Sequence, residues 1–389
     1  MLGDGASCVT ERLSIDGVLN SGRGRLAAIA LISVVVASCS TAIPPSRPQS
    51  RIVAARPTAP VPAYRPPYQV VVPVPPSAPL EVTAPQALVA NIETLGRGFN
   101  GRVGIAVRSI DSGWSVQSNG SILLPQQSVS KLWVAMTVLD LRDSGRLKLD
   151  DPVTVKPEDL TLFHQPIAAL VRAEGYQTTI GGLLQRALTM SDNTANDRLL
   201  RYVGGPRVVR AFIERNQLGD IRFGPGERLL QAKTAGLAWK PEYAVGNAFT
   251  RARASLPRTE RLEAFESYIT DPPDGAAPMA IAGALAKLKQ GRLLSPDSTS
   301  YLIGTMESSK TGKMRLRGAV PQGWTFGHKT GTGQDLAGRT AGYNDVGLLM
   351  APDGKSYAIA VMIGDTIKSI PERQALMQAV VAAVVVNHH

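Results

Sequence analysis

The sequence predicts an α+β domain: an antiparallel sheet built from both ends of the domain, flanked by helices, with an all-helical insert. Apolar and polar residues alternate with a period of two along residues 102–110, and the same period returns after Gly323. Between these segments, residues 131–292 show mostly the apolar spacing of helices. Because both ends share one sheet, we expect a cleft between the sheet and the insert.

The elements follow in chain order. Leu88, Ile92 and Leu95 fall on one helical face, which predicts a first helix over residues 86–95. A strand over residues 102–110 then turns at Asp111-Ser112-Gly113 into a second strand over residues 114–117. Further helices are expected at residues 132–144, 180–190, 194–202, 206–215, 278–289 and 371–386. The remaining strands are expected at residues 324–328, 343–350 and 357–363.

The first 38 residues have the features of an N-terminal extension followed by a secretory signal. Arg23-Gly24-Arg25 precedes an apolar run over residues 26–36, too short for a stable membrane span. The sequence Val36-Ala37-Ser38-Cys39 resembles the bacterial lipobox, which implies cleavage before Cys39 and a lipid on its thiol. The alternative is a signal cleaved nearby, with Cys39 a bystander. The lipobox implies a periplasmic protein that is lipid-anchored to a bacterial membrane.

Residues 39–85 are rich in proline and arginine and poor in acidic residues, which is typical of a semi-rigid extended linker. The domain itself is expected at residues 86–389. The net charge of +11 comes partly from the linker, and no basic patch with interleaved aromatics indicates nucleic-acid binding. We expect a monomer.

Cysteine and histidine usage argues against disulfides and metal. The only cysteine besides Cys39 is Cys8, in the segment that is expected to be removed. The four histidines lack metal-ligand spacing, so we expect neither a metal nor another cofactor.

Three motifs in fixed order point to a serine acyl-transfer enzyme: Ser128-Val129-Ser130-Lys131, Ser191-Asp192-Asn193 and Lys329-Thr330-Gly331. Helix positions three apart share a face, so Ser128 rather than Ser130 is expected to contact Lys131 and act as the nucleophile. A serine needs an adjacent base, and a partly buried lysine can serve.

The other two motifs supply the rest of the site. Ser191-Asp192-Asn193 falls in a break between two predicted helices, from which it can cap the second helix and project into a cleft. Lys-Thr-Gly occurs twice, and we favour Lys329 over Lys310 because Lys329 ends a predicted strand. Such a strand edge can donate to an oxyanion, so we assign the oxyanion hole to the N–H groups of Ser128 and Thr332.

Over residues 85–389 the chain resembles the class A β-lactamases, which share these three motifs. The resemblance extends to Gly204-Gly205-Pro206 and to Ala351-Pro352-Asp353-Gly354-Lys355. It implies that Ser128 is acylated, that Lys131 moves protons and that Ser191 protonates the leaving nitrogen. It also implies a group of residues that hold the substrate: Asn193, Lys329, Thr330, Gly331, Thr332 and, as a weaker candidate, Arg339.

The deacylating glutamate of the family has two candidate positions. The segment Trp239-Lys240-Pro241-Glu242 looks like the family's loop but has lysine where the base should stand. Counting from Phe212 without a gap places Glu227 at that position and Gln231 where an asparagine helps to hold water. We favour Glu227, which makes residues 232–272 an insertion relative to the family.

The leading hypothesis is a lipid-anchored β-lactamase that hydrolyses β-lactam amides through a Ser128 acyl-enzyme. Lysine at position 240 and the long linker leave open a peptidoglycan D,D-peptidase or esterase acting on stem peptides. A third possibility is a non-catalytic lipoprotein that binds the cell wall or senses β-lactams through a stable adduct.

Overall fold

The computed structural model describes residues 83–388. Cys39, the predicted signal and almost all of the predicted linker therefore lie outside the described residues. Within residues 83–388, no helix combines the length and the apolarity that crossing a membrane requires.

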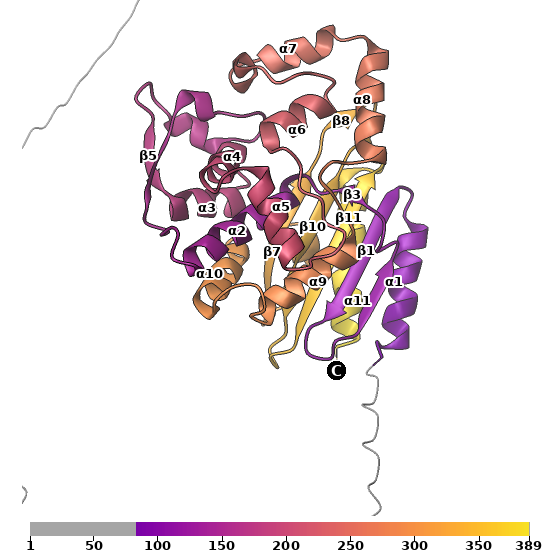
Figure 1. Cartoon of the computed structure of the whole chain (residues 1–389). Helices are drawn as coiled ribbons and strands as arrows, with labels where there is room; N and C mark the ends of the chain where they lie inside the picture. The colour runs from indigo at the N-terminus through magenta and orange to yellow at the C-terminus, as the bar shows by residue number, and fades with distance from the viewer. Residues whose placement is uncertain (1–82, 389) are drawn as a thin grey trace, which may run out of the picture. The chain divides into compact units, whose positions relative to one another are not determined.

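The central sheet is antiparallel and draws its five strands from both ends of the domain, as the sequence predicts (Figure 1). The first two strands form an edge hairpin, and the last strand of the chain lies between them and the other two. In sheet order the strands are β2 (Ser115–Ser118), β1 (Arg102–Ser109), β11 (Ser356–Asp365), β10 (Tyr343–Met350) and β7 (Thr325–Thr332).

The two faces of this sheet carry side chains of different size, and each face packs into its own core. Ile105 and Val361 are fully buried in a core formed with α1 (Gln86–Gly98) and α11 (Ile370–Val386). On the opposite face the small side chains of Ala106 and Ala360 belong to a second core, which includes α9 (Pro278–Lys289). Because successive strand residues point to opposite faces, the period-two pattern produces both cores.

Helices of the insert and of the sheet's second face complete the domain. They are α2 (Lys131–Asp143), α3 (Ile180–Thr189), α4 (Asn193–Tyr202), α5 (Pro206–Arg215), α6 (Glu227–Thr234), α7 (Ala248–Ser255), α8 (Arg258–Thr270), α9 (Pro278–Lys289) and α10 (Pro296–Glu307). Single-turn helices are η1 (Gln127–Ser130), η2 (Pro157–Asp159), η3 (Pro166–Leu170), η4 (Pro241–Ala244) and η5 (Leu316–Ala319).

The sequence analysis did not anticipate α6, α7, α8, α10 and three small sheets. In α8 only Phe265, Tyr268 and Ile269 are buried, so its apolar period is too weak to predict a helix. The insert is mainly helical but also holds the hairpin of β4 (Pro152–Val155) and β5 (Tyr176–Thr179). The other short pairs are β3 (Leu124–Pro125) with β6 (Gly275–Ala276), and β8 (Asp335–Leu336) with β9 (Arg339–Thr340).

Candidate active site

The turn before α2 presents Ser128. Gln127 has a φ of +54°, an uncommon conformation for a residue other than glycine, and its N–H donates to Asp274 Oδ2 at 2.8 Å. Ser130 Oγ donates to the Gln127 carbonyl at 2.8 Å, whereas Ser128 Oγ lies 3.0 Å from Lys131 Nζ. The local fold thus orients Ser128, not Ser130, toward the lysine.

Lys131 is fully buried and contacts every other group of the predicted acylation and deacylation machinery. Its Nζ donates to Ser128 Oγ at 3.0 Å, to the Ser191 carbonyl at 2.9 Å and to Asn193 Oδ1 at 2.5 Å. Ser191 Oγ is 3.4 Å away, and Glu227 Oε1 lies at 3.2 Å in an ion pair. A charge buried this deeply is stable only with such partners.

The Ser-Asp-Asn motif forms the break between α3 and α4. Ser191 adopts a φ of +57°, and Asp192 caps α4 by accepting from the N–H of Ala195 at 3.0 Å. Ser191 Oγ also accepts a hydrogen bond from Lys329 Nζ at 2.9 Å, so this hydroxyl lies between two lysines.

The second Lys-Thr-Gly motif lies on β7. Lys329 is fully buried, and this burial, together with the positive charge of Lys131, lowers its pKa well below the ordinary value. Gly331 is required by packing, because a Cβ there would lie 2.3 Å from the Gln126 carbonyl oxygen. Lys310 is exposed, although its neighbour Thr311 lines the cleft and is hydrogen-bonded to Thr330 at 2.8 Å.

Glu227 begins α6 with its side chain only 4% exposed. Gln231, one turn later, donates to Gln127 Oε1 at 3.0 Å and lies 3.4 Å from Glu227 Oε2. In contrast, Lys240 and Glu242 are exposed on and beside η4 and do not line the cleft. The structure thus brings Glu227, not Glu242, to Lys131.

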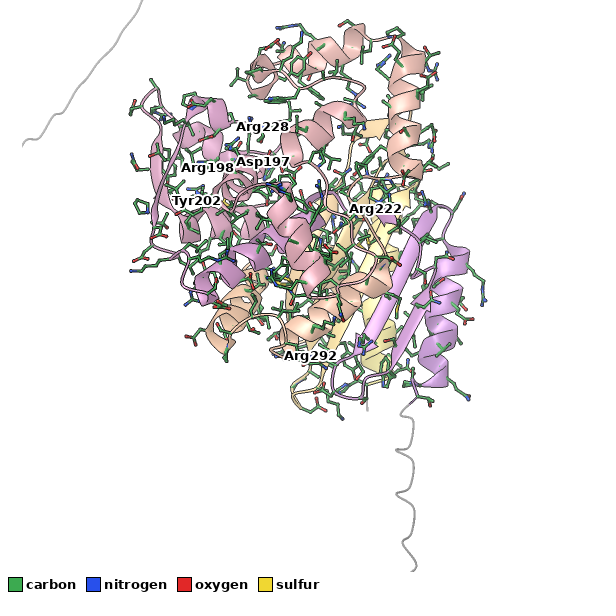
Figure 2. The ribbon with its side chains drawn as sticks, viewed as in Figure 1. Asp197, Arg198, Tyr202, Arg222, Arg228 and Arg292 are labelled. Atoms are coloured by element: carbon green, nitrogen blue, oxygen red, sulfur yellow. The ribbon has the colours of Figure 1, made fainter. Side chains whose placement is uncertain are left out.

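Asp197 of α4 fixes the start of α6, next to Arg228 (Figure 2). Its carboxylate accepts from the N–H of Glu227 at 2.9 Å and from the N–H of Arg228 at 3.1 Å. Burial, followed by the negative charge of Glu227, raises the pKa of Asp197. Gly226 enters the helix with a φ of +103°, which favours glycine.

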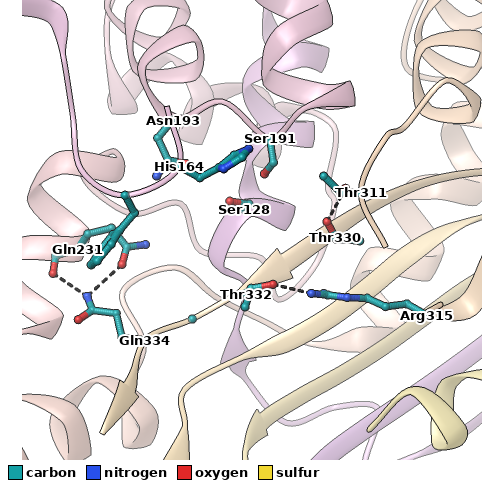
Figure 3. A pocket seen from close by; sticks show the side chains of 12 residues that line it. Ser128, His164, Ser191, Asn193, Gln231, Thr311, Arg315, Thr330, Thr332 and Gln334 are labelled. Atoms are coloured by element: carbon teal, nitrogen blue, oxygen red, sulfur yellow. Dashed lines mark hydrogen bonds between the residues drawn. The ribbon is translucent and has the colours of Figure 1, made fainter. Parts of the chain in front are cut away.

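The cleft has a volume of about 440 Å³, and Figure 3 shows Ser128 near its middle. Thr311, Thr330, Thr332 and Arg315 lie at one end; Gln231 and Gln334, which are hydrogen-bonded to each other, lie at the other. Ser128 and Thr332, whose N–H groups we assign to the oxyanion hole, both line this cleft.

Arg339 does not line the cleft, which corrects its prediction as a substrate-binding residue. On β9, its guanidinium pairs with Glu266 and with Asp365, the latter at 2.8 Å. The guanidinium in the cleft is that of Arg315, which donates to Thr332 Oγ1 at 2.5 Å. Its sequence position, close after the first Lys-Thr-Gly, carried no signal for this role.

Sequence reasoning also missed other lining residues, among them Phe163, His164 and Gln334. They come from loops, where no periodicity indicates which way a side chain points. His164 Nε2 is hydrogen-bonded to the Met190 carbonyl at 2.8 Å, which occupies that nitrogen. Among residues 83–388, no group of three or more histidines, cysteines or acids has the arrangement of a metal site.

Comparison with known proteins agrees with this geometry. Residues 87–388 match the model of the β-lactamase enzyme family. The chain is similar to the extended-spectrum β-lactamase PER-1 of Pseudomonas aeruginosa, with 29% identity over 75% of this chain and 84% of PER-1. β-Lactamase VEB-1 of the same organism is 26% identical over 72% of this chain and 83% of VEB-1.

A solved structure gives the same result. The crystal structure of the TLA-1 extended-spectrum β-lactamase aligns with a TM-score of 0.65 and 26% identity, covering 78% of this chain and 98% of TLA-1. Because the family model spans most of the sequence and the fold is shared, this chain belongs to the β-lactamase enzyme family, in its class A branch.

Proposed function

We propose that this chain is a serine β-lactamase that opens the lactam amide through an acyl-enzyme on Ser128 and then hydrolyses that ester. The observation that carries the proposal is the position of Lys131, whose Nζ lies 3.0 Å from Ser128 Oγ and 3.2 Å from Glu227 Oε1. One buried amine thus connects a nucleophile with a carboxylate base. Relatives named as β-lactamases support the same reaction.

In acylation, Ser128 Oγ attacks the lactam carbonyl and the C–N bond breaks. Lys131 first gives a proton to Glu227, 3.2 Å away, and as a neutral amine it then accepts the hydroxyl proton of Ser128, the group in direct contact with it. Glu227 returns its proton once Lys131 has supplied Ser191. Ser191 gives its proton to the leaving nitrogen and recovers one from Lys131, whose Nζ lies 3.4 Å from Ser191 Oγ. The N–H groups of Ser128 and Thr332 stabilise the negative charge on the carbonyl oxygen.

In deacylation, Glu227 takes a proton from a water molecule that attacks the ester carbonyl, and the Ser128 oxygen leaves with a proton returned through Lys131. Gln231, within 3.4 Å of Glu227, is positioned to orient this water. Positioned proton transfer of this kind contributes about 10²–10⁴-fold to rate.

The charges in the cleft orient the substrate. Arg315 and Thr330 line one end of the cleft, and Lys329, buried next to Thr330, adds positive charge there; together they provide the cationic end for the carboxylate carried by the β-lactam nucleus. Asn193 and Gln231 provide amide groups for the substrate amide at the other end.

The test is to mix the purified protein with a chromogenic cephalosporin and to follow turnover and intact mass together. We expect steady hydrolysis that Ser128→Ala abolishes and Ser130→Ala retains. A persistent adduct without turnover would contradict a β-lactamase and favour the peptidase or sensor alternatives.

We also propose that Cys39 carries a lipid and that the chain is a monomer held in the periplasm, with residues 39–85 as a spacer. The sequence Val36-Ala37-Ser38-Cys39 supports lipidation. Labelling of cells with a radioactive fatty acid should mark the full-length protein and not Cys39→Ala. Label on the variant would contradict the proposal, and light scattering of the purified protein tests the monomer.

A further inference from the structure

A second cavity, of about 330 Å³, lies between α7, α8 and the turn that joins β8 to β9. Figure 1 shows α7 and α8 beside β8 at the top of the domain. Two arginines line this cavity, Arg253 from α7 and Arg261 from α8, together with Asp335 of β8 and Gly338 of the turn that follows it. We call it the rim cavity.

The two arginines are half-buried cations with no ion-pair partner among residues 83–388. Arg253 donates to the backbone carbonyl of Asp335 at 3.0 Å, and Arg261 Nε is buried with no hydrogen-bond partner in the described chain. Burial, followed by the positive charge of Arg261, lowers the pKa of Arg253. The nearby Arg339, in contrast, is neutralised by two carboxylates.

This charge arrangement is unfavourable unless an anion joins it. Half-buried cations that face each other lose hydration; Arg253 gains only a backbone carbonyl and a partial offset from the negative charge of Asp335. The buried Nε–H of Arg261, which has no acceptor in the described chain, costs free energy. Asp335 also lines the cavity, but its Oδ1 accepts from Thr340 Oγ1, and it forms no ion pair with Arg253 or Arg261 in the described structure. The rim cavity therefore favours a ligand carboxylate.

The rim cavity and the amide-lined end of the catalytic cleft are lined by consecutive residues of the chain, Asp335 and Gln334. β8 begins at Asp335, directly after Gln334, whose side chain lines the cleft and donates to Gln231. A substrate whose nuclear carboxylate binds at the Arg315 end extends its acylamino side chain toward Gln231 and Gln334 (Figure 3). A longer side chain that extended past Gln334 would meet β8, whose residues Asp335 and Leu336 line the rim cavity.

We propose that Arg253 and Arg261 form an anion subsite that binds a carboxylate at the end of the acylamino side chain of a β-lactam. The inference rests on the proposed function. It makes the α7–α8 segment, which the sequence predicts to be an insertion, a determinant of substrate preference.

The test uses two cephalosporins that differ only at the end of the acylamino side chain, one with a carboxylate and one with its methyl ester. For the full chain carrying Arg253→Gln and Arg261→Gln, we expect kcat/KM for the carboxylate substrate to fall about tenfold, as loss of one favourable charge contact allows. We expect kcat/KM for the ester to stay unchanged. The matched control is Arg251→Gln with Arg258→Gln, which removes two exposed arginines from the same helices.

Each outcome decides the proposal. Equal loss for both substrates, equal loss in the control, or no loss would overturn the subsite. If sodium acetate and phosphate inhibit both substrates equally through Arg253 and Arg261, the cavity binds free anions rather than the side chain. If the unaltered enzyme turns over neither substrate, the proposed function fails. In that case the rate of adduct formation, measured by intact mass, still gives the ratio of reactivity toward the carboxylate and the ester substrates.

Discussion

At the scale of the residue, Lys131 and Lys329 share one hydroxyl. Their Nζ atoms lie 3.4 Å and 2.9 Å from Ser191 Oγ. Burial of Lys329, followed by repulsion from the positive charge of Lys131, lowers the pKa of Lys329. The residue whose pKa is lowered is therefore Lys329, which the proposed mechanism uses to bind the substrate carboxylate.

Lys329 gives a prediction about pH. A lysine with a lowered pKa loses its charge at lower pH than an ordinary lysine, so its attraction for the substrate carboxylate is lost earlier as pH rises. We expect kcat/KM to fall with rising pH well below about pH 10.4, the ordinary value for lysine. Lys329→Arg should move this alkaline limb to higher pH. If the alkaline limb of the pH profile does not move in Lys329→Arg, the limb belongs to a group other than Lys329.

The cleft arginine gives a second prediction. Arg315 donates to Thr332 Oγ1 and lies with Lys329 at the end that receives the nuclear carboxylate, whereas Arg339 is paired outside the cleft. In steady-state kinetics, Arg315→Ala should raise KM about tenfold with a smaller change in kcat. Arg339→Ala should leave KM unchanged. The reverse pattern would restore Arg339 as the substrate-binding arginine.

At the scale of the element, α8 braces the nucleophile turn against α6. Tyr268 OH accepts from Gln127 Nε2 at 2.6 Å and donates to Asp274 Oδ2 at 3.2 Å. Gln127 in turn accepts from Gln231 at 3.0 Å, so the brace extends to the helix that carries Glu227. Buried networks of this kind couple their members.

We expect Tyr268→Phe to slow deacylation about tenfold more than acylation, because it frees Gln127 and Gln231 but leaves the Lys131 contact to Ser128. Rapid mixing with a chromogenic cephalosporin, followed by intact mass, measures both steps. The control is Tyr243→Phe, in the neighbouring η4, whose buried ring has no hydroxyl hydrogen bond within the described residues. Equal effects of the two variants would contradict a role for the Tyr268 hydrogen bonds in deacylation.

Asp274 links the same brace to stability. Burial raises its pKa to about 7, so in the folded protein it holds a proton that the unfolded chain loses near pH 4. Its contribution to stability is therefore full below about pH 4 and is lost as pH rises toward about 7. Asp274→Asn lacks this titration and keeps an acceptor for the Gln127 N–H. The quantity to measure is the thermal midpoint of Asp274→Asn minus that of the unaltered protein. We expect this difference to be more positive at pH 8 than at pH 5. An equal difference at the two pH values would contradict the raised pKa.

At the scale of the whole molecule, the sequence predicts the sheet well because period-two alternation reports directly on two buried faces. It also predicts the contact of Ser128 with Lys131, because positions three apart share a helix face. The grouping of this pair with Ser191 and Lys329 is predicted by the family's set of three motifs and not by local spacing. Arg315, Gln334 and the brace through Tyr268 could not be predicted, since loop conformation and long-range hydrogen bonds bring them together.

The helical insert and the central sheet meet at the catalytic cleft. The insert supplies Lys131, Ser191 and Glu227, and the sheet supplies Lys329. We propose that this arrangement completes both acylation and deacylation, with Glu227 as the base for water.

The most direct test is time-resolved intact mass of Glu227→Gln mixed with a cephalosporin, with Glu242→Gln as the exposed control. We predict that Glu227→Gln becomes acylated on Ser128 and stays so, with turnover lower by about 10²–10⁴-fold, while Glu242→Gln turns over like the unaltered protein. Undiminished turnover by Glu227→Gln, or a stable adduct only in Glu242→Gln, would contradict the account.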